Sequence, residues 1–130
     1  MGLFVANTDS HRPEWVRQAA FAINWLLNRQ TKMGRGAPVT KTADFTVADI
    51  DVFLINNKAG SSCTVTLPSA SQWSGRELHL LNYQAQTVVS SSSNVVPVTG
   101  GAAGTAILPA TAGAWGLLVS DGTNWLIMAS

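Results

Sequence analysis

Few side chains in this sequence could carry out metal, nucleophilic or phosphate chemistry. His11 and His79 lie far apart, and Cys63 is the single cysteine. Structural zinc sites need several Cys or His ligands at short spacings, so no zinc site is predicted. A Ser-His-Asp site that uses either histidine stays open, because such triads are assembled by the fold. The glycine-rich run at residues 100–104 is not followed by the Lys-Ser or Lys-Thr pair that a phosphate-binding loop needs.

The carboxylates are also poorly placed for catalysis. Asp49 and Asp51 lie two positions apart with Asp44 nearby, which weakly resembles a calcium loop. The EF-hand spacing is missing, and this favours solvated loop carboxylates. Glu77 has no acidic neighbour in the sequence, so a glycosidase pair would require the fold to bring Asp121 close. The sequence therefore predicts no catalytic residue, no metal site and no cofactor, and we do not expect an enzyme.

A helix is predicted over residues 13–30, where apolar residues recur with helical period. Ser10 or Asp9 can cap its N-terminus, and Pro13 suits the first turn. The apolar positions cover most of the helix circumference, so the helix must be buried on several sides. It either packs on its own β-domain or is buried against sister chains or a docking socket. The predicted attachment residues are Trp15, Val16, Ala19, Phe21, Ile23, Trp25, Leu26 and Leu27.

The remainder of the chain has the pattern of a β-domain. Residues 31–44 are rich in Gly, Pro and polar residues and are predicted to be a linker, with the β-domain starting near Phe45. Short β-prone runs then recur about every ten residues, which is typical of a sandwich or jelly roll. We therefore expect a helix and linker over residues 1–41 and an antiparallel β-sandwich or jelly-roll-like domain over residues 42–130. The expected strands are 52–56, 63–67, 77–82, 87–90, 95–98, 105–108, 114–120 and 125–128.

Several apolar residues are expected to pack in the core of this domain. Cys63 lies in an apolar alternation, which predicts a buried, unreactive thiol. Proline cannot donate to a β-ladder, so Leu67-Pro68 should end one strand and Leu108-Pro109 another. Each pair is followed by a tryptophan, Trp73 or Trp115, that we expect in the core. The alternative is a carbohydrate-binding sandwich in which Trp73, Trp115 or Trp125 forms an exposed platform.

The charge content indicates a protein that works in an assembly. Charged residues make up 12% of the chain, about half of the ~25% usual for soluble domains. A surface so poor in charge is expected to be covered by other subunits or by partners, which predicts a homo-oligomer, with a homotrimer favoured, or a part of a larger particle. The basic residues before position 42 are scattered, so nucleic acid is not an expected partner. No apolar run approaches the ~20 residues of a membrane span, so no membrane partner is expected.

Five stretches of the chain resemble virion proteins of tailed bacteriophages. Residues 65–70 (VTLPSA), 75–82 (GRELHLLN) and 118–125 (LVSDGTNW) are similar to the small β-domains of phage tail fibres. The closing Asp121-Gly122 turn followed by Trp125 belongs to that pattern. Residues 13–17 (PEWVR) and 22–27 (AINWLL) are similar to N-terminal helices of phage virion proteins. The residues that carry the β-domain motif are Leu67, Pro68, Trp73, Asp121, Gly122 and Trp125.

The resemblance implies a trimeric, non-catalytic structural protein of a tailed-phage virion that is attached through its N-terminus. A short tail fibre or a fibre adaptor is the favoured assignment, and a capsid decoration protein is the alternative. The expected partners are further copies of the chain and other proteins of the tail or capsid. A host surface glycan remains open as a ligand through the tryptophans. The chain lacks the shaft and the large tip of long fibres, so the sequence gives no support to direct host recognition.

Overall fold

The computed structural model describes residues 35–130, which are mainly β-structure. The predicted helix at 13–30, with all of its attachment residues, lies outside the described residues. Gly36–Ser130 form one compact unit. Within it no helix is long and apolar enough to cross a membrane. The strands are β1 (Val39–Lys41), β2 (Phe45–Thr46), β3 (Phe53–Asn56), β4 (Cys63–Thr66), β5 (Glu77–Asn82), β6 (Val88–Ser90), β7 (Val95–Val96), β8 (Ala106–Leu108), β9 (Trp115–Ser120) and β10 (Trp125–Ala129), with one short 3₁₀ helix at Ala70–Gln72.

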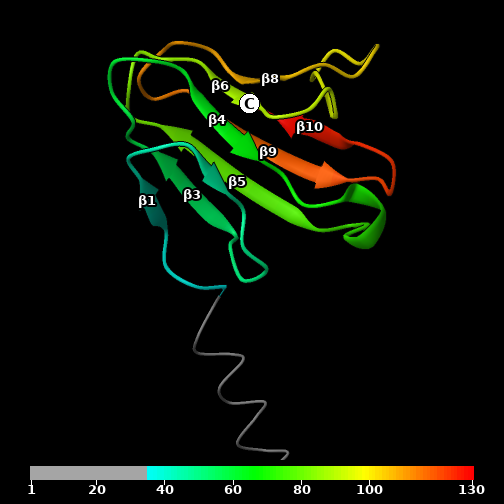
Figure 1. Cartoon of the computed structure of the whole chain (residues 1–130). Helices are drawn as coiled ribbons and strands as arrows, with labels where there is room; N and C mark the ends of the chain where they lie inside the picture. Colours follow the sequence, from blue (N-terminus) through cyan, green and yellow to red (C-terminus); the bar gives the residue numbers. More distant parts are fainter. Residues whose placement is uncertain (1–34) are drawn as a thin grey trace, which may run out of the picture. The chain divides into compact units, whose positions relative to one another are not determined.

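These strands form two sheets that enclose one core (Figure 1). Sheet A has six strands in the order β1-β3-β5-β9-β10-β7, and sheet B has four in the order β2-β4-β6-β8. From β1 to β8 the chain alternates between the two sheets. Strands that are hydrogen-bonded neighbours, such as β1 and β3 or β2 and β4, are therefore separated along the chain by one strand of the other sheet. All eight expected β-runs are strands, with ends that differ from the expected ones by at most two residues.

The expectation of an antiparallel sandwich is wrong for most strand pairs. Of the eight pairings between the named strands of residues 35–130, five are parallel and three are antiparallel. The reason is the alternation between sheets: the crossings from β1 through β2 to β3 and from β3 through β4 to β5 return the chain to sheet A in its original direction, whereas the crossing through β8 to β9 reverses it. Antiparallel pairing is found where β9 joins β5 and β10, and where β8 joins β6. A jelly-roll topology is not confirmed.

The first strand lies in the segment that the sequence predicts as a linker. β1 pairs with β3 in parallel, with Thr40 opposite Ile55. Just after β3, the backbone N–H of Asn57 donates to the Lys41 carbonyl at 2.7 Å. The β-unit therefore begins at Gly36, before the expected boundary at residue 42. Composition alone could not reveal this strand, because its three residues carry no run of apolar side chains.

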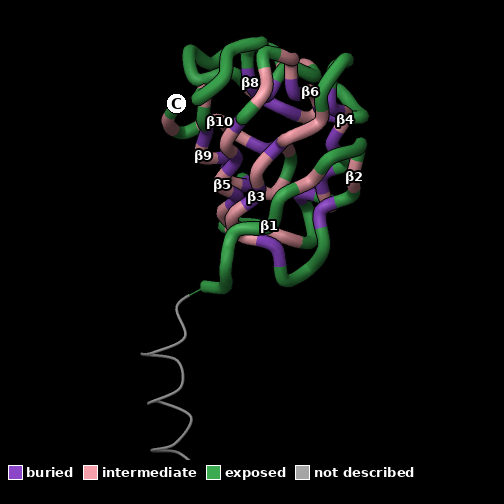
Figure 2. Tube along the Cα trace, turned by 90° about the vertical axis from the view of Figure 1, so that its left-hand side faces the viewer, coloured by how far each residue is buried: buried purple, intermediate pink, exposed green. Residues whose placement is uncertain are grey.

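The core lies between the two sheets and is built from alternate residues of their strands. Sheet A contributes Leu54, Leu78, Leu80, Leu118 and Trp125, all at most 4% exposed. Figure 2 shows the buried stretches along the strands and the exposed ones in the turns. The two layers approach closely at β9. A Cβ added to the glycine at position 116 would lie 3.3 Å from Leu108 Cδ2, so an alanine there would require the Leu108 side chain to move by a few tenths of an ångström.

Four buried polar side chains each end a strand in the same manner. Asn56, Asn82, Ser90 and Ser120 are the last residues of β3, β5, β6 and β9, and each is at most 3% exposed. The side-chain oxygen of each accepts the backbone N–H two residues further along, at 3.1–3.2 Å. Such local bonds favour a turn over continued strand. The buried polar residues therefore fix where these strands stop.

The same side chains also donate hydrogen bonds across the fold. Asn56 Nδ2 donates to Asn82 Oδ1 at 2.9 Å, and Ser120 Oγ donates to the Ala70 carbonyl at 2.7 Å. Asn82 Nδ2 donates to the carbonyls of Gln86 and Pro109, at 2.7 and 3.1 Å. Asn82 thus connects the ends of β3 and β5 with the loops that follow β5 and β8.

We predict that Asn82→Leu lowers the free energy of unfolding by about 3–5 kcal/mol. The change removes the partners of several buried polar groups, each of which costs roughly 1–3 kcal/mol when left without one. Asn57→Leu is the matched control, because Asn57 Oδ1 accepts one bond, from Gln84 Nε2 at 2.6 Å. Its loss should cost about 1 kcal/mol. Urea denaturation of the two variants decides the matter, and equal losses would refute the assigned role of Asn82.

Candidate functional site

The surface that stands out is the side of sheet A that faces away from the core, called here the outer face. Successive residues of a strand point to opposite sides of the sheet. The burial of β3, β5 and β9 follows this alternation, with the inward residues buried and the outward residues partly exposed. Over the four strands β3, β5, β9 and β10, the outer face consists of Phe53, Ile55, Glu77, His79, Leu81, Trp115, Leu117, Val119, Leu126 and Met128.

The outer face of sheet A is apolar, in contrast to that of sheet B. Eight of its ten residues are apolar, so these strands carry apolar side chains on both faces. In sheet B the outward residues are small or polar: Thr46, Thr64, Thr66, Val89 and Ala106. A sheet that is apolar on both faces is normally covered on both. The difference between the two sheets therefore points to the outer face of sheet A as a contact surface.

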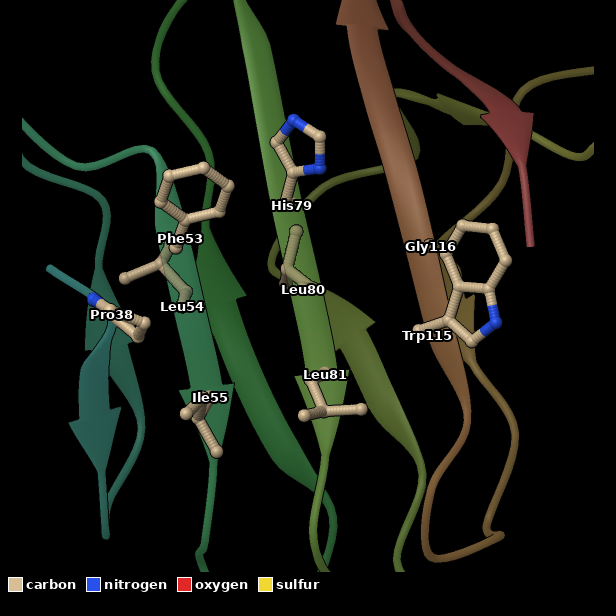
Figure 3. Close-up of a pocket in the computed structure, with 9 residues that line it drawn as sticks. All are labelled: Pro38, Phe53, Leu54, Ile55, His79, Leu80, Leu81, Trp115 and Gly116. Carbon is tan, nitrogen blue, oxygen red and sulfur yellow. The ribbon is translucent and has the colours of Figure 1, made fainter. Parts of the chain in front are cut away.

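The outer face is hollowed over β3 and β5. A depression of about 290 Å³ lies there, lined mainly by apolar residues. Figure 3 shows Phe53 and His79 along one side of it, Ile55 and Leu81 along the other, and Trp115 rising from β9 at its edge. Trp115 is 50% exposed, so the expectation that it is a core residue is wrong. It stands on the outward side of β9, next to the glycine that allows the sheets to approach.

One polar pair interrupts the apolar outer face. His79 Nε2 lies 3.5 Å from Glu77 Oε1 on the same strand. The His79 ring also lies 5.0 Å from the Phe53 ring, tilted by 42°. On the neighbouring strand β9, Leu117 is opposite His79 and Val119 is opposite Glu77. The titratable groups of the face are therefore next to each other, and their neighbours on β3 and β9 are apolar.

The structure brings three of the predicted motif residues together, in a structural role. Trp125 is fully buried, and its Nε1 donates to the Pro68 carbonyl at 2.9 Å. Leu67, which precedes that proline, is 7% exposed and belongs to the same core cluster. The alternative of Trp125 as an exposed ligand platform is therefore excluded. The Leu-Pro segment after β4 is fixed to β10 by this tryptophan.

The remaining motif residues organise the loops. Trp73 packs against the core and carries the Arg76 guanidinium 4.3 Å above its ring. Arg76 Nη2 donates to the carbonyls of Ala48 and Asp51 at 2.7 and 2.8 Å, which ties down the loop after β2.

The turn between β9 and β10 is the predicted Asp121-Gly122 hairpin. Asp121 Oδ1 accepts the amides of Thr123 and Asn124, both at 2.8 Å. Gly122 has φ 93°, a conformation that disfavours other residues. The hydrogen bond from the backbone N–H of Asn124 has the largest effect in lowering the pKa of the Asp121 carboxyl below its ordinary value. The bond from the backbone N–H of Thr123 lowers it further.

The acidic residues and the cysteine have local structural partners. The Asp44 carboxylate accepts hydrogen bonds from Lys58 Nζ at 2.7 Å and from the backbone N–H of Thr64 at 2.9 Å. These bonds lower the pKa of the carboxyl. Asp51 Oδ2 accepts the Ala48 amide at 2.8 Å. Cys63 is buried as expected, and its burial raises the pKa of the thiol. Within residues 35–130, no group of three or more His, Cys, Asp or Glu side chains is arranged to hold a metal ion.

The outer face was not identified from the sequence, although a signal for it exists. A half-buried strand should alternate apolar and polar residues, whereas β9 and β10 are almost continuously apolar. That pattern could have indicated a sheet covered on both sides. Comparison of the chain with protein-family models, with curated protein sequences and with solved structures found no match.

We predict that the stability of the Asp121→Asn variant falls less steeply at acidic pH than that of the wild-type protein. A carboxyl whose pKa is lower in the folded state stabilises the protein above its unfolded pKa of about 3.9 and loses this contribution as the pH falls through the folded value. The wild-type protein should therefore lose more stability than the variant as the pH falls below about 4. Thermal melts between pH 6 and pH 2.5 measure this. Parallel profiles would show that the turn carboxylate contributes nothing.

Proposed function

We propose that this chain is a non-catalytic structural protein that works as a homo-oligomer in a tailed-phage virion. The observation that supports self-assembly most strongly is the apolar outer face of sheet A. The 26 strand residues of sheet A, at ~4.8 Å between strands and ~3.3 Å per residue, give a surface of about 400 Å² in projection. This is about half of the ~800 Å² that each partner contributes to a standard interface. The face is therefore large enough for the centre of a contact, whose rim the surrounding loops must complete.

The virion assignment rests on the phage-like stretches of the sequence. In this proposal the N-terminal helix at 13–30 attaches the chain to the particle, and the β-unit is the displayed, self-associating part. The favoured position is a short tail fibre or a fibre adaptor, and capsid decoration is the alternative. Immunogold labelling of purified particles separates the two, because label on the tail supports the first and label on the shell supports the second. Particles without label would refute the virion assignment.

A carbohydrate-binding module is the second candidate, because Trp115 is half exposed. Sugar recognition also needs polar groups that fix the hydroxyls. The outer face offers Glu77 and His79, and a second depression beside Trp115 has Thr111 and Ser130 in its lining. The composition of the outer face resembles the core of a protein interface more closely than a glycan site. Glycan-array binding that Trp115→Ala abolishes would favour this second candidate.

We predict that Leu117→Glu disrupts self-association and that Thr64→Glu does not. Both positions are outward and partly exposed, on sheets A and B respectively. A glutamate buried without a partner in the interface costs about 3–5 kcal/mol, which should raise the dissociation constant at least 100-fold. Sedimentation equilibrium of the full chain measures it, with a trimer expected for the wild type. A monomeric wild type, or equal behaviour of the two variants, would contradict the proposal.

We also predict that replacing Trp15 and Trp25 together with Ala weakens incorporation into particles. These side chains are part of the proposed attachment helix, where each buried large apolar group contributes roughly 1.5–3 kcal/mol. The β-unit should remain folded, which near-ultraviolet circular dichroism of the buried Trp125 would report. Unchanged incorporation, measured by mass spectrometry of purified particles, would move the attachment contact to the β-unit.

A further inference from the structure

The two halves of the outer face differ in shape. The hollow lies over β3 and β5, whereas the most exposed apolar side chains rise from β9 and β10. Trp115 is 50% exposed and Met128 is 58% exposed. Met128 lies at a register shift in β10, between Ile127, which packs against the core, and Ala129, which is opposite the outward-facing Leu117. One half of the face is therefore recessed and the other half projects.

We propose that the outer face of one copy packs against that of a second copy, with the projecting half of each lying on the recessed half of the other. This inference rests on the proposed self-assembly and specifies its register. The symmetry axis runs parallel to the strands, above the line between β5 and β9. Rotation about this axis places β9 and β10 of one copy opposite β5 and β3 of the next.

In this register the projecting and the recessed residues also lie at the same height along the strands. Ile55, Leu81 and Trp115 are opposite one another in sheet A and form one row across it. An axis parallel to the strands preserves that row, so Trp115 of one copy meets Ile55 and Leu81 of the next. An apolar cavity of ~150 Å³ accommodates a benzene ring, so the hollow of about 290 Å³ has room for an indole ring. The projecting tryptophan thus fits the recess in position and in size.

The charges on the outer face also favour another copy over a charged partner. Glu77 and His79 are its two titratable residues, and they already lie 3.5 Å apart. No cationic or anionic patch is left on this face that would call for an oppositely charged surface. Interfaces between identical subunits are apolar and poor in charge at their centre, as this face is. Around a two-fold axis each face makes this contact twice and the assembly closes at two copies, whereas in a homotrimer the projecting half of each copy lies on the recessed half of the next around a three-fold axis parallel to the strands.

Cross-linking between two single-cysteine chains tests the register. In a Cys63→Ala background, full-length chains with Phe53→Cys are mixed with chains with Met128→Cys. Phe53 lies in one row with His79 and Leu117, and Met128 lies level with Leu117. In the proposed register, β3 of one copy faces β10 of the next, so a short bis-maleimide joins the two kinds of chain. Like chains should not be joined, because their labelled strands are offset by about three strand spacings, ~14 Å. Joining of like chains, or of Thr64→Cys with Met128→Cys, would overturn the register.

A second measurement does not depend on the cysteine variants. Trp115→Ala in the full chain should raise the dissociation constant at least ~30-fold, as expected for a tryptophan at the centre of an interface. Tyr83→Ala is the matched control, because Tyr83 is 52% exposed but lies beyond the end of β5 and outside the hollow. Its effect should be under ~3-fold. Equal effects of the two variants would overturn the assignment of Trp115 even if the chain proved to be an oligomeric virion protein.

Discussion

The fold depends on where its buried polar side chains sit. Each of four strands ends in a buried polar residue: Asn56, Asn82, Ser90 or Ser120. The side-chain oxygen of each accepts the backbone N–H two residues further along, and each side chain also donates a hydrogen bond within the fold. A buried amide or hydroxyl without partners is costly, so these positions cannot slip along their strands without loss of stability. This constraint fixes the register of β3, β5, β6 and β9 relative to the loops that follow them.

The same arrangement explains why sheet A carries a second apolar face. The inward-facing polar residues of β3, β5 and β9 are confined to strand ends, and the middle of each strand is mainly apolar on both sides, with His79 as the polar exception on the outer face. One side packs on sheet B, and in the proposed function the other side packs on further copies of the chain. The low charge of the sequence agrees with that proposal, because a protein covered by its own copies needs less charged surface.

The sequence was informative where local chemistry decides structure. The Asp121-Gly122 turn, the end of β4 at Leu67-Pro68 and the buried Cys63 all follow from residue type and were predicted. Strand direction was not, because alternation between two sheets depends on long-range pairing that apolar spacing does not encode. Trp115 was assigned to the core because it follows Leu108-Pro109 as Trp73 follows Leu67-Pro68. Strand alternation places it outward, whereas Trp73 packs inward beneath Arg76.

The central claim is that the outer face of sheet A is covered in the assembled protein. Hydroxyl-radical footprinting of the full chain tests it most directly, since it reports the solvent access of individual side chains. Trp115, Met128 and Tyr83 are similarly exposed in the single chain. At concentrations where the assembly dominates, the account predicts that Trp115 and Met128 are protected while Tyr83 is oxidised, and that dilution removes the protection. Oxidation of Trp115 as readily as Tyr83 at every concentration would contradict it.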